Sequence, residues 1–78
     1  MRLEIITPEK TVYSGEISLV QLPGIDGSFE ILNNHAPLIS VLKDGKIKIQ
    51  DAQKQTQYFE VKGGVVEVLQ NKVLVLAE

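Results

Sequence analysis

The reactive side chains of this chain are few, and their types and spacing do not form a catalytic set. Nucleophilic catalysis needs a serine, threonine or cysteine that is oriented by a neighbouring base. The sequence contains one histidine, His35, and no cysteine. None of its serines lies in a Gly-x-Ser-x-Gly motif, which would place a nucleophile on a sharp turn. We therefore predict a protein that is not an enzyme.

The same residues do not indicate a metal or a cofactor. A metal site needs several ligands at a regular spacing, whereas this histidine stands alone among carboxylates that are spread along the chain. Gly24 and Gly27 enclose Ile25-Asp26, but the lysine of a phosphate-binding loop is missing. We interpret these glycines as turn residues and the carboxylates as solvated surface charge.

Size and charge exclude several classes of protein. The 78 residues, 44% of them hydrophobic, predict one domain over residues 1–78. The net charge of -2 and the absence of a basic stripe argue against nucleic-acid binding. Met1 leads directly into strand-like sequence, so we expect neither a secretory signal nor direct insertion into a membrane.

The segments that would position any functional site are predicted to be short β-strands. Ile47 and Ile49 alternate with polar residues, which is typical of a strand with one buried face. Val65–Leu69 and Val73–Ala77 are apolar at nearly every position, which suits strands covered on both sides, inside a sandwich or under a partner.

Asp44-Gly45 predicts a hairpin between Leu38–Leu42 and Lys46–Gln50. Asn71-Lys72 predicts a turn between the two Val-rich runs, because Asn71 tolerates the left-handed conformation. The pattern predicts an all-β protein of about nine strands, a sandwich or a small barrel.

One segment breaks the alternation. Between Ser28 and Ser40, large apolar residues surround the polar turn Asn33-Asn34-His35. Some of these apolar side chains must enter the core, but a stretch this rich in them also predicts an exposed apolar patch at one edge of the sheet. Core packing and docking both remain open on the residues alone.

Several segments together resemble a known family. LPGIDG at Leu22–Gly27, NHAPL at Asn34–Leu38, FEVKGGVVEV at Phe59–Val68 and NKVLVLA at Asn71–Ala77 follow one another in a specific order and spacing. This order is similar to that of the epsilon subunit of F-type ATP synthase, and the likeness covers essentially Leu3 to Glu78. Within that family the segment corresponds to the N-terminal domain.

The resemblance implies a fold and a role. The fold is a flattened β-sandwich of two antiparallel sheets with about nine to ten short strands. The role is that of a non-catalytic rotor subunit in the central stalk, which links the gamma subunit to the polar loops of the c-ring and couples proton or sodium flow to ATP synthesis. The implied location is the cytoplasmic face of the bacterial inner membrane, as a peripheral part of the F1 sector.

The resemblance also implies two groups of docking residues, none of which is expected to move a proton. The gamma-docking surface is expected around Thr7, His35, Pro37, Leu38 and Ser40, with Pro37 and Leu38 partly exposed. The loop facing the c-ring is expected to comprise Pro23, Gly24, Ile25, Asp26, Gly27, Ser28, Phe29, Glu30 and Ile31.

The chain departs from the family pattern in two ways. Bacterial relatives usually continue into a C-terminal helical hairpin that inhibits ATP hydrolysis and in some members binds ATP, whereas this sequence ends at Glu78. We therefore expect that form of inhibition and that nucleotide site to be absent. The family often has Gly-Glu-x-Gly-Ile where this chain has Gly27–Ile31, so Ser28 replaces a carboxylate that commonly faces the c-ring.

The alternative is a free-standing β-sandwich that binds a small ligand or a carbohydrate. Such a module needs a concave face lined with aromatic side chains. Aromatic residues make up only 5% of the chain, and they do not alternate along one strand. The sequence therefore favours the rotor subunit.

Overall fold

A computed structural model describes residues 1–78 and consists of β-strands joined by turns and loops. No segment forms a helix that is long and apolar enough to cross a membrane. The eight strands are β1 (Arg2–Ile6), β2 (Thr11–Gly24), β3 (Gly27–Leu32), β4 (Leu38–Leu42), β5 (Gly45–Asp51), β6 (Thr56–Val61), β7 (Gly64–Leu69) and β8 (Lys72–Ala77).

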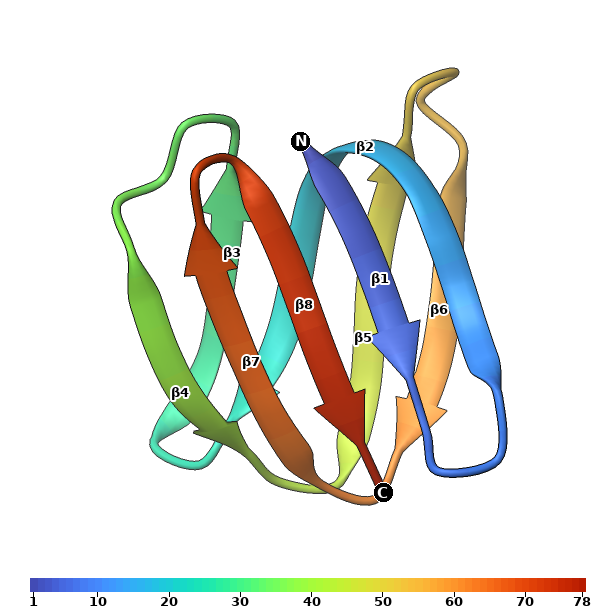
Figure 1. Ribbon diagram of the computed structural model, residues 1–78, viewed down its shortest axis with the longest axis vertical. Helices are drawn as coiled ribbons and strands as arrows, with labels where there is room; N and C mark the ends of the chain where they lie inside the picture. The colour runs from blue at the N-terminus through green and yellow to red at the C-terminus, as the bar shows by residue number, and fades with distance from the viewer.

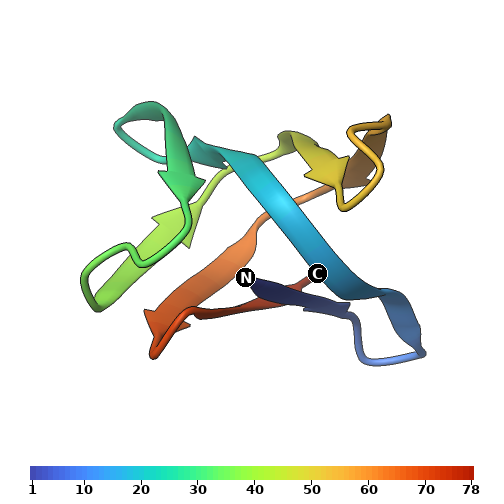
Figure 2. The ribbon, with the colours of Figure 1, turned by 90° about the horizontal axis from the view of Figure 1, so that it is seen from above.

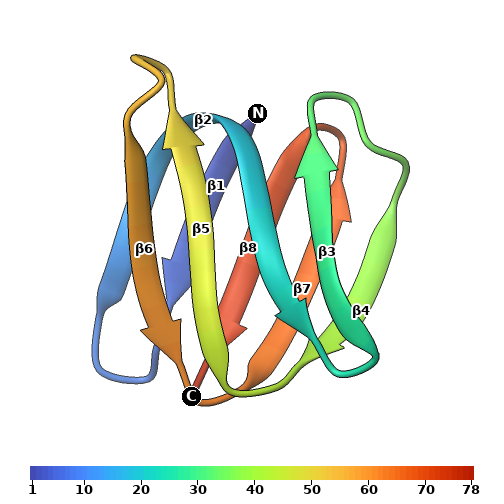
Figure 3. The same cartoon turned by 180° about the vertical axis from the view of Figure 1, so that it is seen from behind.

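The strands form two layers that face each other, as the prediction of a β-sandwich required. The front layer contains β4, β7, β8 and β1 (Figure 1), and the back layer contains β6, β5, the second half of β2, and β3 (Figure 3). Viewed from above, β2 runs diagonally from one layer to the other (Figure 2). Hydrogen bonding is continuous along the path β1-β8-β7-β4-β2-β5-β6.

The long strand β2 explains why there are eight strands and not nine or ten. Its first half pairs with β1, from Thr11 to Glu16, and its second half pairs with β3 and β5. The register shifts between Ile17 and Leu19, so an irregularity at this point bends one strand across both layers. Pairing is antiparallel except between β1 and β8, which run parallel.

The core lies between the layers and is entirely apolar. Sixteen buried hydrophobic residues form one cluster, and no polar or charged side chain is buried. Inward positions alternate with outward ones, so Ile47 and Ile49 of β5 are fully buried while Lys46 beside them is exposed. The predicted strand with one buried face is therefore confirmed.

The turns agree with the sequence in two places and differ in one. Gly24 pairs with Gly27 across a two-residue turn, and Asn71 has the left-handed backbone (φ 60°) that asparagine tolerates. The hairpin predicted at Asp44-Gly45 is wrong. β4 pairs with β7 and β5 pairs with β2 and β6, so Lys43-Asp44 connects the two layers.

Candidate docking surface

The outer side of the front layer is apolar, unlike the outer side of most two-layer sheets. In β7, Val66 and Val68 point into the core, whereas Val65 and Leu69 point outward and are 40% and 51% exposed. β8 repeats the pattern, with Val75 buried and Leu76 exposed. Both strands are therefore apolar on the side that the core does not cover.

Cross-strand pairing joins these outward residues into one surface. Val41 of β4 lies opposite Val65 of β7, and Val65 lies opposite Leu76 of β8. One step along the strands, Glu67 lies between Ile39, which is 71% exposed, and Leu74. We call the following set the apolar face: Ile39, Val41, Val65, Leu69, Leu74 and Leu76.

The apolar face is hollowed. Three adjoining hollows of about 250, 180 and 300 Å³ lie over β4, β7 and β8. Glu67 lines all three, and Ile39, Leu69 and Leu74 each line two of them. A contiguous hollowed apolar surface on a small domain is typical of a site that another protein covers.

Charged and polar side chains border the apolar face along the first part of β1. The Lys72 ammonium lies 3.5 Å from the Glu4 carboxylate, across the β8–β1 pair. The Arg2 guanidinium donates a hydrogen bond of 2.6 Å to the Ser14 hydroxyl. This polar border covers the first part of β1, whereas half-buried Ile6 at the end of β1 lies opposite Leu76.

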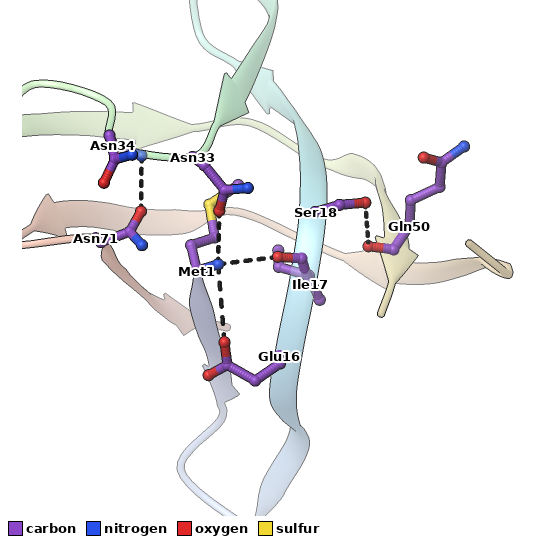
Figure 4. Close-up of polar contacts among 8 residues, drawn as sticks. All are labelled: Met1, Glu16, Ile17, Ser18, Asn33, Asn34, Gln50 and Asn71. Carbon is purple, nitrogen blue, oxygen red and sulfur yellow. Dashed lines mark hydrogen bonds and ion pairs between the residues drawn. The ribbon is translucent and has the colours of Figure 1, made fainter. Parts of the chain in front are cut away.

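A network of hydrogen bonds fixes the loop between β3 and β4, which contains His35 (Figure 4). The Met1 amino group donates to the Asn33 side-chain oxygen at 2.7 Å and to the Ile17 carbonyl at 3.0 Å. It also lies 3.8 Å from the Glu16 carboxylate. The Asn34 backbone N–H donates to the Asn71 side-chain oxygen at 2.7 Å, which connects this loop to the β7–β8 turn.

The predicted gamma-docking residues lie around the apolar face and do not form one cluster. His35 and Pro37 are exposed in the β3–β4 loop, which flanks one end of the front layer. Thr7 lies in the β1–β2 loop at the opposite end (Figure 1), where its hydroxyl donates to the Lys10 carbonyl at 3.1 Å. Leu38 and Ser40 are half-buried and face inward, opposite Val68 and Val66.

Sequence reasoning named Leu38 and Ser40 but missed their outward neighbours. Ile39 and Val41 are the exposed residues of β4, and β7 and β8 contribute the rest of the apolar face. The signal was present, because Val65–Leu69 and Val73–Ala77 are apolar at positions of both parities. It identified strands covered on two sides but not which positions point away from the core.

The predicted c-ring loop includes both core and surface residues. Pro23, Gly24 and Ile31 are buried, and Phe29 packs against the core. The other residues of the loop are exposed, with Ile25 at 60%. These are Ile25, Asp26, Gly27, Ser28 and Glu30. The turn between β2 and β3 lies at the same end of the molecule as the C-terminus (Figure 1).

The aromatic side chains mostly contact the core. The rings of Tyr13 and Phe59 lie 5.4 Å apart, centroid to centroid, and both pack against the buried cluster, as does Phe29. Tyr58, which is 59% exposed, is the one aromatic residue open to solvent. No group of three or more histidine, cysteine or carboxylate residues lies close enough together to hold a metal ion.

Comparison with known proteins identifies relatives of this chain. The sequence model of a family described as "ATP synthase, Delta/Epsilon chain, beta-sandwich domain" matches residues 1–78. The ATP synthase epsilon chain of Chlorobium limicola is 43% identical over 77 residues, which span 99% of this chain and 88% of the relative. That of Desulforamulus reducens is 46% identical over 79 residues, which span 99% of this chain and 58% of the relative.

A solved structure shares the fold. A chain in the mitochondrial ATP synthase of Euglena gracilis, solved with OSCP, F1 and the c-ring, superimposes with a TM-score of 0.87 at 13% identity. The match covers 96% of this chain and 48% of that chain.

Proposed function

This chain belongs to the ATP synthase delta/epsilon chain family, and we propose that it works as a rotor subunit that links the gamma subunit to the c-ring. It is a non-catalytic part of the F1 sector, peripheral to the membrane. In this role residues 1–78 act as one rigid domain. They transmit rotation between the two partners and so help to couple ion flow to ATP synthesis.

The apolar face is the observation that supports docking onto gamma. Folding does not require these side chains to be apolar, because the core is complete without them. Exposure of five large aliphatic residues on three neighbouring strands, with half-buried Leu74 among them, favours association, and gamma is the partner that family membership suggests. The face lies between the two loops that contain Thr7 and His35.

Within this proposal, the gamma-docking residues contribute to binding in different ways. His35, Pro37 and Thr7 border the surface at its two ends. Leu38 and Ser40 support it from below, because they face the core side of β4. Ile39 and Leu76 provide the direct contact, since they are among the most exposed aliphatic side chains of the front layer.

The exposed part of the β2–β3 turn is the proposed contact with the c-ring. Ile25 offers an apolar tip, and Asp26, Ser28 and Glu30 surround it with polar groups. Such a mixed surface suits the polar loops of a membrane ring better than the membrane itself. Under this proposal the chain lies, in a bacterium, at the cytoplasmic face of the inner membrane.

Binding to purified gamma tests the proposal through two neighbouring residues of β4. Ile39→Ala should weaken gamma binding by about 2 kcal/mol and leave the thermal midpoint nearly unchanged, as expected for an interface anchor. Leu38→Ala should instead lower the midpoint, because Leu38 packs against the core. Calorimetric titration and thermal unfolding give the two readouts. Unchanged affinity of the Ile39→Ala variant would refute docking through this face.

A further inference from the structure

Glu67 is the charged residue at the centre of the apolar face, whereas Lys72, opposite Leu69, lies at its border. Ile39 and Leu74 flank Glu67 on the neighbouring strands, and Val65 and Leu69 flank it along β7. Glu67 lines each of the three hollows. Any partner that covers the apolar face must therefore cover this carboxylate as well.

Glu67 forms no ion pair within the chain, and Lys72, which lines one of the same hollows, pairs with Glu4 instead, at 3.5 Å. Glu67 also accepts no hydrogen bond from another side chain. In the isolated domain, water solvates the carboxylate because the residue is exposed.

Docking changes the surroundings of this carboxylate. Removal of an ionised group from water is costly unless an opposite charge and hydrogen bonds replace the lost solvation. Charged residues are accordingly depleted at the centres of protein interfaces. A carboxylate in the middle of an apolar docking surface therefore indicates a partner with a complementary cation.

We propose that the gamma segment covering the apolar face is apolar but contains one lysine or arginine, which pairs with Glu67. The inference rests on the proposed function, since it concerns the same surface. The aliphatic residues provide the contact area, whereas the Glu67 pair fixes the register of the partner along β7. A segment without the cation would leave the carboxylate unpaired, so Glu67 selects among apolar partners.

The direction in which one substitution changes the affinity for gamma tests the proposal. Glu67→Gln keeps the shape of the side chain and removes its charge. If gamma supplies a cation, this variant should bind gamma about tenfold more weakly or worse, and its affinity should depend less on salt concentration. If gamma supplies none, removal of a charge that docking desolvates should leave the affinity unchanged or raise it.

The experiment uses calorimetric titration of the full chain with purified gamma at low and high salt. Glu60→Gln is the matched control, because Glu60 is an exposed carboxylate on β6 in the back layer. That variant should bind like the unmodified chain. A second variant, Glu67→Lys, should bind more weakly than Glu67→Gln because two like charges would then meet. Thermal midpoints verify that each variant is folded.

The outcomes separate this inference from the proposed function. In one outcome the unmodified chain binds gamma and Ile39→Ala weakens binding, but Glu67→Gln binds equally or more tightly. The proposed cation on gamma is then refuted, and docking through the apolar face stands. If the unmodified chain does not bind gamma, or if Ile39→Ala has no effect, the proposed function fails and this inference fails with it.

Discussion

The two outer sides of the sandwich differ sharply, although the same strand alternation produces both. The back layer presents Glu30, Gln21, Lys48 and Tyr58 in one cross-strand row. The corresponding middle row of the front layer contains Ile39, Glu67 and Leu74, with Val41, Val65 and Leu76 beside it. The back is mostly polar, whereas the front is mostly aliphatic over β4, β7 and β8.

This difference separates the requirements of folding from those of assembly. Both layers bury their inward residues in one cluster, so each has what a stable sandwich needs. A polar outer side keeps a small domain soluble, and the back layer follows this rule. The front layer does not, which indicates that selection for a partner, and not for stability, determines its outer residues.

The largest expected effect comes from inserting the same charge on either side of β8. Val75 is fully buried, so Val75→Asp should cost several kcal/mol, a large part of the total stability of a small domain. Leu76 is 51% exposed, so Leu76→Asp should leave the domain folded. Chemical denaturation followed by circular dichroism measures both variants. A folded Val75→Asp or an unfolded Leu76→Asp would contradict the assignment of the two sides.

A smaller effect concerns the close approach of β7 and β8, on which the apolar face depends. Gly64 has a φ of 144°, and a Cβ atom there would overlap the Leu76 carbonyl oxygen. Gly64→Ala should therefore combine backbone strain of about 1–3 kcal/mol with a steric penalty of similar size. Each kcal/mol lowers the thermal midpoint of a domain this small by roughly 4–8 °C.

Gly27→Ala is the control for that prediction. Gly27 also has a positive φ of 130°, but no atom lies within 4 Å of the Cβ that alanine would add. This variant should show backbone strain alone, so its midpoint should fall less than that of Gly64→Ala. Equal losses would mean that β7 and β8 are not packed as closely as the structure shows.

The smallest expected effect concerns the loop that borders the apolar face. Asn71→Gly permits the left-handed backbone but removes the oxygen that accepts the hydrogen bond of the Asn34 amide. The loss should cost about 0.5–1.5 kcal/mol and speed hydrogen exchange at Asn34. NMR-detected exchange measures it. Unchanged exchange at Asn34 would show that this hydrogen bond does not hold the loop.

Much of the fold was predictable because it depends on local patterns. Alternation located the strands, and small or left-handed residues such as Gly24 and Asn71 located two turns. The hairpin at Asp44-Gly45 was predicted wrongly because turn residues specify a reversal of the chain but not the strand that the next segment joins. The span of β2 across both layers is likewise a long-range property.

The docking surface was only partly predictable. A segment that is apolar at nearly every position, such as Val65–Leu69, indicates that both sides are covered. It does not reveal which side faces the core, because that depends on the register with β4 and β8. For this reason the sequence pointed to Leu38 and Ser40, whereas the structure exposes Ile39 and Val41.

The most direct test of the central claim measures which outer side gamma covers. The chain has no cysteine, so Leu76→Cys and Tyr58→Cys each introduce a single thiol, one on the front and one on the back. Both thiols should react with maleimide in the free chain, as mass spectrometry can quantify. With gamma bound, the thiol at position 76 should become protected and that at position 58 should remain reactive. Equal reactivity, or protection at position 58 alone, would contradict docking through the apolar face.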